Sequence, residues 1–368
     1  MILADSPWPR FGGDQANRGH RNISGPIAGS TIRYINLLED RESGATPSEY
    51  MAGVVVMADR SLRVTYAGMV YAYSPEHHLL WRRDLRPYYP PGDASLQWHS
   101  LPTALQTGQV LVGLSRALLL VAADGNIVNV HGSDDLLDDS RLSPNVSRSG
   151  SPLVSSPLGA MYLLLDGTWL QIGRRGFGYD LDPPAVYDDD SLAIAGYAGT
   201  GFCRVDLDGH MRWQTDFGSA DMVPTINQHQ VAAVGSVSMN ITAFYSPEGK
   251  RIGTYPHAAV CAEHPAGGWI ARTHDRLSLD AGIARLDPTG TELWTYGVKM
   301  AKGGRRVQPI VDTEGRIYVR HLGGILCLNQ DGRLVFTIDL PSERPDPISL
   351  IAPGVLMCLS GNHLVCIR

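Results

Sequence analysis

Glycine recurs along this chain at a nearly constant interval, each time inside a short polar turn between two apolar runs. Successive turns are separated by 48, 42, 42, 40, 41 and 42 residues. A period of this length indicates a repeat architecture, in which every repeat packs against its neighbours. The turn positions are His77, which stands where glycine is expected, followed by Gly125, Gly167, Gly209, Gly249, Gly290 and Gly332.

The residues around each turn favour β-hairpins. The flanking runs have strand length and are rich in β-branched and aromatic residues. Asp-Gly, a dipeptide that tolerates positive φ and suits tight hairpins, occurs at four of the seven turns. Because no stretch shows a sustained apolar period of 3.6 residues, the chain is predicted to be all-β.

The repeat length points to a particular architecture. About 42 residues accommodate four strands of five or six residues with tight turns. Four-stranded antiparallel units repeated around an axis form a β-propeller. Seven hairpins are visible, and residues 348–368 supply three more strands without a fourth. Residues 31–38 are predicted to complete that last blade, which closes an eight-bladed ring and removes an exposed sheet edge.

The chain is therefore predicted to be a single β-propeller domain over residues 1–368, with residues 1–30 as an N-terminal extension packing on it. The turn followed by tryptophan in residues 205–213 and 286–294, together with the opening stretch 8–22, resembles the PQQ (pyrroloquinoline-quinone)-like propeller superfamily. That superfamily includes quinoprotein dehydrogenases and outer-membrane assembly lipoproteins of the BamB type. Such a fold hosts many unrelated functions.

The resemblance also implies how neighbouring blades are joined. In the superfamily, a tryptophan that closes the outer strand docks on the next blade. By position, Trp81, Trp213 and Trp294 would do so here, with Phe336 as a substitute.

No cofactor is predicted. Quinoprotein dehydrogenases of this superfamily carry an adjacent pair of cysteines over PQQ and a calcium site. This chain has no adjacent cysteines, and its aspartate runs at 133–140 and 188–191 lack the spacing of a calcium loop. PQQ binding is therefore not expected. A metal such as zinc or iron is possible if several histidines converge.

Composition limits the classes of partner that the protein is expected to bind. The formal net charge is −6 and only three residues are lysine, so no basic stripe for nucleic acid is present. No apolar run reaches the length of a membrane span, and membrane insertion is not expected. The N-terminus lacks the pattern of a signal peptide, which predicts a cytoplasmic protein, or an exported one if a leader has been trimmed. The oligomeric state is left open.

Two faces of the ring differ in which loops they carry. The turns between the first and second strands and between the third and fourth strands share one face, which we call the turn face. The blade-to-blade connections and the loops between the second and third strands share the other, the connection face. Functional residues of propellers usually line the funnel of the connection face, as loops on a rigid scaffold often do.

Candidate site residues were taken from the connection face. Candidate catalytic histidines are His99, His257, His274 and His321. Candidate binding residues are Tyr88, Tyr89, Trp98, Arg148, Asp182, Tyr197, Asp221, Asp275, Arg276, Arg305, Arg306, Asp346 and His363. Because polar residues collect in loops of any propeller, this list by itself does not establish a site.

Two functions remain open at this point. The first is a rigid binding module for a protein or small-molecule ligand, favoured by the absence of a complete catalytic motif. The second is a cofactor-independent enzyme of the lyase, isomerase or cyclase type, in which histidine moves a proton and arginine stabilises negative charge. The long connection at 86–100, which contains three prolines and several aromatic residues, is predicted to form a wall or partial lid over the funnel.

Overall fold

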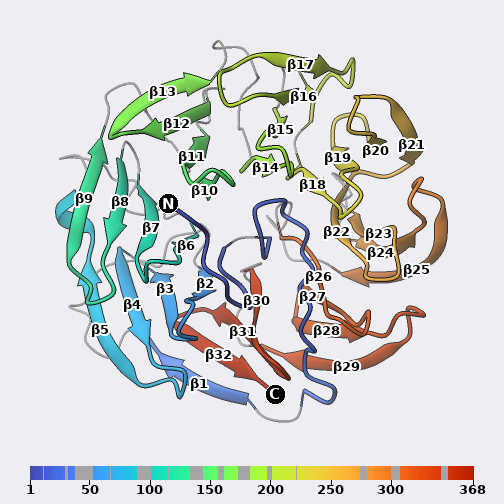
Figure 1. Ribbon diagram of the computed structural model, residues 1–368. Helices are drawn as coiled ribbons and strands as arrows, with labels where there is room; N and C mark the ends of the chain where they lie inside the picture. Colours follow the sequence, from blue (N-terminus) through green and yellow to red (C-terminus); the bar gives the residue numbers. More distant parts are fainter. Residues whose placement is uncertain are drawn as a thin grey trace.

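Eight four-stranded antiparallel sheets stand around a central axis in the computed structural model of this chain (Figure 1). Consecutive strands pair within seven of the sheets, so each of these blades is a simple meander from the inner to the outer strand, whereas the eighth takes its outer strand from the N-terminal part of the chain. The predicted eight-bladed β-propeller is confirmed. The structure describes residues 1–10, 12–29, 32–37, 53–66, 68–88, 101–114, 117–132, 144–155, 161–172, 183–196, 201–220, 222–273, 280–299, 307–340 and 347–368.

Blades 1 to 4 hold strands β2 to β17, and one short 3₁₀ helix, η1 (Arg86–Tyr88), follows blade 1. Their bounds are β2 Gly53–Val56, β3 Leu62–Tyr66, β4 Met69–Tyr73 and β5 Leu79–Asp84 in blade 1; β6 Thr103–Ala104, β7 Val110–Leu114, β8 Ala117–Val121 and β9 Ile127–Gly132 in blade 2; β10 Asn145–Val146, β11 Pro152–Ser155, β12 Met161–Leu165 and β13 Thr168–Ile172 in blade 3; and β14 Ala185–Val186, β15 Leu192–Ala195, β16 Phe202–Val205 and β17 Met211–Gln214 in blade 4.

Blades 5 to 8 hold strands β18 to β32 together with β1. Their bounds are β18 Thr225–Ile226, β19 Ala232–Ser236, β20 Ile241–Tyr245 and β21 Arg251–Tyr255 in blade 5; β22 Ala259–Glu263, β23 Trp269–Thr273, β24 Asp280–Leu286 and β25 Glu292–Lys299 in blade 6; β26 Ile310–Val311, β27 Ile317–His321, β28 Gly324–Leu328 and β29 Leu334–Asp339 in blade 7; and β30 Ile348–Ala352, β31 Val355–Ser360, β32 His363–Ile367 and β1 Ile32–Asn36 in blade 8.

The two ends of the chain share blade 8, as the repeat count predicted. Strand β1 pairs antiparallel with β32 over five residues, from Ile32 opposite Ile367 to Asn36 opposite His363. The N-terminal strand thereby becomes the outer strand of the blade that the C-terminal residues begin (Figure 1). Every blade consequently has four strands, and the ring closes by joining the two ends of the chain in one sheet.

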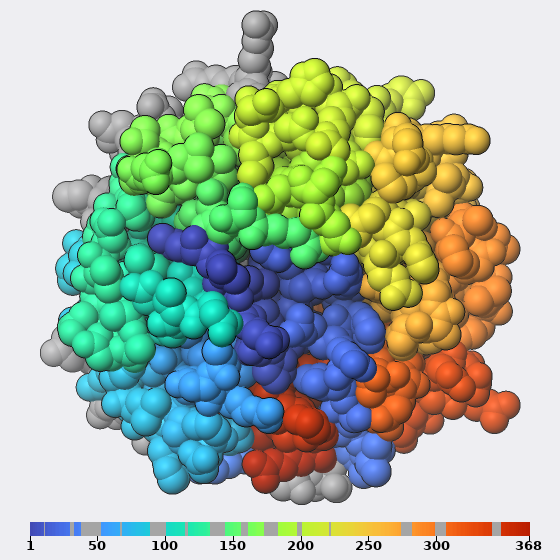
Figure 2. Space-filling model, in the orientation of Figure 1, coloured from blue at the N-terminus to red at the C-terminus, as the bar shows by residue number. Residues whose placement is uncertain are grey.

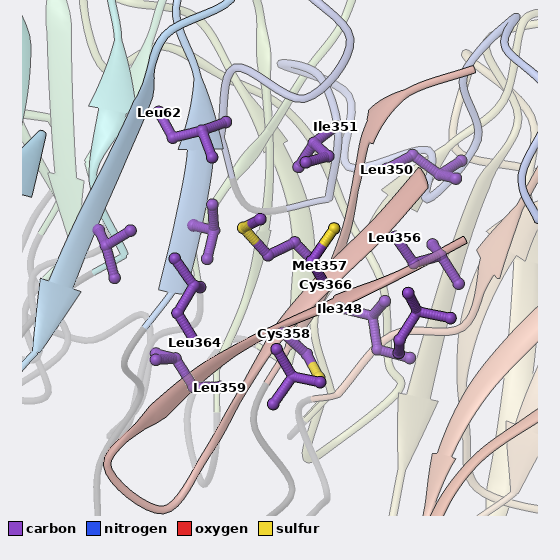
Figure 3. Packing of buried hydrophobic residues seen from close by; sticks show 14 of the residues in the cluster. Leu62, Ile348, Leu350, Ile351, Leu356, Met357, Cys358, Leu359, Leu364 and Cys366 are labelled. Carbon is purple, nitrogen blue, oxygen red and sulfur yellow. The ribbon is translucent and has the colours of Figure 1, made fainter. Parts of the chain in front are cut away.

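The core lies between blades rather than at the centre of any single sheet. The inner strand β2 and the second strand β7 are buried throughout, whereas every residue of the outer strand β5 is exposed or half-buried. Figure 3 shows this packing where blade 1 meets blade 8, with Leu62 from one side and Met357 and Leu364 from the other. Burial of apolar side chains across each such seam is the main force that holds neighbouring blades together.

All five cysteines are buried, and none of them forms a disulfide. In blade 8, Cys366 lies opposite Met357, and Cys358 lies opposite Val365, so the two thiols are one position out of register. Because side chains alternate along a strand, the two thiols lie on opposite faces of the blade 8 sheet, where each is a small buried packing residue (Figure 3).

The periodic turn positions share one backbone conformation. All seven lie in the left-handed region, which favours glycine because a side chain there is strained. His77 adopts it as well, although it carries a side chain. The φ angles are 68° at His77, 86° at Gly125, 81° at Gly167, 89° at Gly209, 83° at Gly249, 91° at Gly290 and 77° at Gly332.

Docking of outer-strand tryptophans on the next blade is confirmed for the three predicted residues. In each case the indole Nε1 donates to a backbone carbonyl in the adjacent turn. The bonds run from Trp81 to Ala123 at 2.6 Å, from Trp213 to Pro247 at 2.8 Å and from Trp294 to Gln330 at 3.0 Å. Phe336 instead packs against Gly29, because blade 8 has two chain ends where the other blades have this turn.

Residues 1–10 and 12–29, which we call the N-terminal segment, cross the centre of the ring on the turn face. Figure 2 shows this segment in blue between the blades. From Trp8 onward its backbone carbonyls accept a hydrogen bond from every blade, at 2.7 to 3.0 Å. The donors are Val56 N to Trp8, Ala104 N to Pro9, Asn145 Nδ2 and Val186 N to Gln15, Ile226 N to Ala16, Glu263 N to Arg18, Val311 N to Gly19 and Gly354 N to Ser24.

Candidate functional site

A pocket of about 550 Å³ lies at the centre of the turn face. The N-terminal segment forms most of it, and turns of blades 1, 5 and 6 complete the wall. We call it the central pocket. Its lining residues are Asp5, Ser6, Pro7, Asp14, Arg18, His20, Arg21, Asn22, Ile23, Ala58, Arg60, Gln228 and Glu263.

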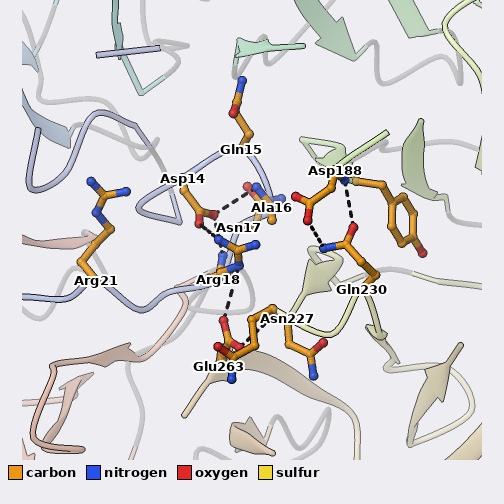
Figure 4. A network of polar contacts seen from close by, with 12 residues as sticks. Asp14, Gln15, Ala16, Asn17, Arg18, Arg21, Asp188, Asn227, Gln230 and Glu263 are labelled. Carbon is orange, nitrogen blue, oxygen red and sulfur yellow. Dashed lines mark hydrogen bonds and ion pairs between the residues drawn. The ribbon is translucent and has the colours of Figure 1, made fainter. Parts of the chain in front are cut away.

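A chain of charged contacts holds one side of the central pocket in place (Figure 4). Asp14 Oδ1 accepts hydrogen bonds from the backbone N–H groups of Ala16 and Arg18, at 3.0 and 3.1 Å. Its second oxygen pairs with Arg18 Nη1 at 3.0 Å, and Arg18 Nε lies 3.4 Å from Glu263 Oε2. Glu263 Oε1 in turn accepts the N–H of Gln228 at 2.8 Å. The network links the N-terminal segment to blades 5 and 6.

Two titratable groups of this pocket are shifted in opposite directions. The side chain of Glu263 is only 5% exposed, and burial raises its pKa even though Gln228 and Arg18 favour the charged form. Burial lowers the pKa of His20, so the imidazole is neutral at neutral pH. His20 Nε2 is buried and has no hydrogen-bond partner in the part of the chain that the structure describes. A neutral imidazole and a buried carboxyl therefore line the same hollow.

The pocket also carries cations that no carboxylate neutralises. In the described part of the chain, neither Arg21 nor Arg60 has a carboxylate oxygen within 4.0 Å, and Arg21 Nη2 donates to the carbonyl of Ser6. Ser6, the one hydroxyl among the lining residues, donates its Oγ to Val56 O at 2.6 Å, which leaves it no histidine partner. The arrangement can bind a polar ligand, but it holds no activated serine nucleophile.

Most residues selected from the sequence lie outside the described residues. These are His99 and His274 among the catalytic candidates, and Tyr89, Trp98, Asp182, Tyr197, Asp221, Asp275, Arg276, Arg305, Arg306 and Asp346 among the binding candidates. They stay predictions.

Tyr88, in η1, and His257 lie in blade-to-blade connections as the sequence predicted, whereas His321 ends β27 and His363 begins β32, at the edges of their predicted loops. No contact between described residues joins any of the four. His257 packs edge-on against Tyr255 at 5.1 Å, and His363 against Tyr34 at 5.8 Å. Both aromatic partners belong to outer strands, so these imidazoles lie away from the channel.

His321 Nδ1 accepts from the N–H of Gly323 at 3.3 Å, and burial lowers the pKa of its imidazole. Among the described residues, no three His, Cys, Asp or Glu side chains come together as metal ligands. A search of the same residues for a helix long and apolar enough to cross a membrane finds none.

The assignment of Arg148 to the connection face was wrong. Arg148 lies in the turn between β10 and β11, which belongs to the turn face. The inner strand of blade 3 has only two residues, so the chain turns before reaching this arginine. Its guanidinium pairs with Asp188, and its Nε donates to Tyr187 O at 3.1 Å. Arg148 therefore joins blade 3 to blade 4.

Sequence reasoning did not select the residues of the central pocket. Residues 5–23 lie before the first repeat, so the period gave them no place in the ring. A signal was present: the stretch 12–22, GGDQANRGHRN, concentrates glycine, amide and charged residues in a segment without strand character. Such composition suits an irregular segment that turns tightly and exposes polar groups.

Comparisons with known proteins agree with the fold. A family model described as "Outer membrane protein assembly factor BamB" matches residues 279–366. A search of curated proteins finds no significant match.

Three solved structures illustrate the structural likeness. BamB from Moraxella catarrhalis has a TM-score of 0.62 and 15% identity, covering 88% of this chain and 99% of that chain. A catalytically inactive virginiamycin B lyase from Staphylococcus aureus with quinupristin has a TM-score of 0.55 and 9% identity, covering 92% and 99%. A chain of the mitotic checkpoint complex has a TM-score of 0.56 and 12% identity, covering 95% and 93%. Identities this low show a shared fold alone.

Proposed function

Because this chain is an eight-bladed β-propeller of the PQQ-like superfamily, we propose that it acts as a rigid binding module without PQQ. Its ligand is a small polar molecule that enters the central pocket. Propellers in BamB and in the mitotic checkpoint complex have the same fold, which supports a binding role in general terms. Fold likeness does not name a ligand, so the argument rests on the pocket itself.

One observation carries the proposal. The central pocket, of about 550 Å³, has the volume of a small-molecule site, and its charged side chains are held in place by contacts within the protein. Arg60 lines it without an ion pair or side-chain hydrogen bond among the described residues, so its charge is available to a ligand. A pre-arranged wall lowers the entropy lost on binding, which favours affinity.

The test is a thermal-shift screen of the full chain with small polar metabolites: amino acids, sugar acids and nucleotides. We expect at least one class to raise the Tm saturably, as a ligand that binds only the folded state must. Arg60→Gln and Glu263→Gln should weaken that shift. Arg333→Gln is the matched control, because Arg333 is an exposed arginine of the blade 7 turn outside the pocket.

Two results would count against the pocket as the binding site: a screen without a saturable shift, or a shift that survives both pocket substitutions. Addition of PQQ is expected to leave the Tm unchanged, and a saturable PQQ effect would contradict that part of the proposal.

A second function is supported by the opposite pKa shifts of His20 and Glu263 in one hollow. A neutral imidazole can accept a proton, and a carboxyl with a raised pKa can return one. The fold is shared with virginiamycin B lyase, which adds general support for an enzyme of the lyase type. In this alternative the ligand is a substrate, and Arg21 stabilises the negative charge that develops on it.

Turnover separates the two functions. Each compound that shifts the Tm is incubated with the protein, and its conversion is followed by mass spectrometry. An enzyme should lose roughly 10²- to 10⁴-fold of kcat with His20→Asn while the ligand-induced Tm shift persists. His257→Asn and His321→Asn test the connection-face histidines in the same assay. Absence of conversion for every compound bound would leave binding as the function.

A further inference from the structure

Arg10 is a fully buried cation with an incomplete set of partners. Its side chain is 0% exposed, and its Nη1 donates to Asp14 O and to Asn17 Oδ1, both at 2.5 Å. Among the described residues, its Nε and Nη2 have no hydrogen-bond partner. These two atoms form the side edge of the guanidinium, the pair of donors that binds the two oxygens of a carboxylate in parallel.

No counter-ion neutralises this group. Among the described residues, no carboxylate oxygen lies within 4.0 Å of the Arg10 guanidinium. Burial lowers its pKa to about 9, and the more distant charge of Asp14 opposes the shift. Arg10 nevertheless stays protonated at neutral pH. An unpaired buried charge is costly, so the remaining donors of Arg10 call for an anion.

A second buried arginine shows what a completed site looks like in this protein. Arg204 Nε donates to Ser191 Oγ at 2.7 Å, Nη1 to Pro247 O at 2.6 Å and Nη2 to Asp189 Oδ2 at 2.7 Å. All three nitrogens have a partner, and one partner is a carboxylate. Arg10 has the equivalent partners at one nitrogen only.

One partner of Arg10 leads into the ring beneath the N-terminal segment, away from the central pocket. Arg10 does not line that pocket. Its partner Asn17 sends Nδ2 to Pro183 O and Pro224 O, which precede the inner strands of blades 4 and 5. The Asn17 side chain therefore points into the ring. Gln308, whose Nε2 donates to the carbonyl of Asn17, has a buried Oε1 that also lacks a partner among the described residues.

The space at this level is small. A cavity of about 10 Å³, enough for one water-sized group, is lined by Trp8, Gly12 and Gln308, and Arg10 does not line it. An oxyanion bound at Arg10 therefore has to displace packed side chains, and a planar anion of three or four heavy atoms displaces fewer of them than a bulky or tetrahedral one. Size therefore favours the smallest oxyanions.

We propose that the Nε–Nη2 edge of Arg10 binds a small planar oxyanion of the formate, bicarbonate or nitrate class inside the central channel. The anion supplies the two missing hydrogen bonds and the missing negative charge. It is held beneath the N-terminal segment, and its binding does not depend on a ligand in the central pocket.

Thermal unfolding of the full chain with increasing sodium formate tests the site, with ionic strength held constant by a bulky organic anion. Formate should raise the Tm saturably, and phosphate should have a much smaller effect. Arg10→Gln should abolish the formate effect. Arg204→Gln should keep it, because Arg204 is a buried arginine with its own carboxylate.

A second measurement covers the case in which Arg10→Gln does not fold. Wild-type protein is dialysed in formate, desalted and denatured, and the released anion is measured by ion chromatography. About one anion per chain is expected from simple one-site binding. Arg10→Lys should release less anion, because lysine keeps the positive charge but lacks the two parallel N–H donors of the guanidinium. The proposal is overturned if wild type releases no anion and shows no formate dependence, or if Arg10→Gln shows the same dependence as wild type.

Discussion

The indole of Trp213 lies directly on the backbone of Gly249 in the next blade. A Cβ at Gly249 would stand 2.6 Å from Cγ of the ring, closer than packed carbon atoms approach. The same indole donates its N–H to Pro247 O. Gly125 and Gly332 meet Trp81 and Trp294 in the same way. Glycine is thus required at these turns both for positive φ and for the contact between blades.

Gly249→Ala should destabilise the ring more than Gly167→Ala. Both glycines have a φ near 80°, at 83° and 81°, so alanine is strained at either position by about 1–2 kcal/mol. Only Gly249 carries an indole on its face, since nothing lies within 4 Å of a Cβ at Gly167. Overpacking adds roughly 1–3 kcal/mol at Gly249. Chemical denaturation measures both losses, and equal losses would show that docking does not tighten the joint.

Between blades 8 and 1, neither the outer-strand tryptophan of blade 8 nor the turn glycine of blade 1 is present. Arg33 lies opposite Cys366, as Trp81 lies opposite Ala72, and so takes the tryptophan position. His77 takes the glycine position. We expect Arg33→Trp combined with His77→Gly to be more stable than the sum of the single substitutions, because each alone leaves a clash or a gap.

A double-mutant cycle from denaturant unfolding measures this coupling, which should reach about 1 kcal/mol, within the range for residues in contact. Effects that simply add within about 0.5 kcal/mol would mean that the seam does not follow the geometry of the other joints.

Acid should weaken the protein through His264. This residue is 3% exposed, and burial together with the charge of Arg285 lowers its pKa to about 4. The unfolded chain, with a histidine pKa near 6.5, therefore takes up this proton first. The contribution of His264 to stability is complete above pH 6.5 and is lost as the pH falls towards 4, by roughly 2–3 kcal/mol.

Denaturant unfolding at several pH values compares wild type with His264→Asn. The variant should show a smaller loss of stability between pH 6.5 and 5, while groups common to both proteins cancel in the comparison. Glu263 acts with the opposite sign, since its raised pKa makes its contribution largest at low pH. Identical slopes for the two proteins would rule out His264 as a source of acid sensitivity.

Asp189 should matter more to stability than its neighbour Asp188. Asp189 accepts from the Arg204 guanidinium, whose side chain is 8% exposed and lies 3.9 Å from the centre of the Tyr187 ring. Asp189→Asn leaves that cation without its carboxylate. Because Asp189 is itself 43% exposed, we expect a loss of roughly 1–2 kcal/mol. Asp188→Asn, which breaks an exposed pair with Arg148, should cost less than about 1 kcal/mol. Thermal unfolding of both variants compares them directly, and equal losses would contradict the role of the buried arginine.

The ring could be predicted because its signal is repeated in side chains. The seven turns share one backbone conformation, which marks the blades. The outer-strand tryptophans each follow their turn position at the same distance in sequence, which marks the contacts between blades. Closure followed from counting, since residues 348–368 supply three strands and need a fourth. Even His77, which breaks the glycine pattern and lies 48 residues before the next turn, could be placed from the two apolar runs that flank it.

The central pocket could not be found in this way. The N-terminal segment is held mostly by hydrogen bonds to its backbone carbonyls. Because every residue type has a backbone carbonyl, such bonds cannot be recognised in the sequence. Periodicity therefore directed attention to loops between repeats, and Arg148 was misplaced because the inner strand of blade 3 is only two residues long. Sequence patterns carry the least information about main-chain contacts and about strands of two residues.

The hydrogen bonds of the N-terminal segment run in the order of synthesis. From Trp8 to Ser24 its carbonyls meet the blades in sequence, and the last partner, Gly354, lies near the opposite end of the chain. During translation, the N-terminal segment therefore cannot complete its hydrogen bonds until blade 8 has been synthesised. Contacts spanning nearly the whole polypeptide slow folding. We therefore expect ring closure by pairing of β1 with β32 and docking of the N-terminal segment on the blades to occur together, late in folding.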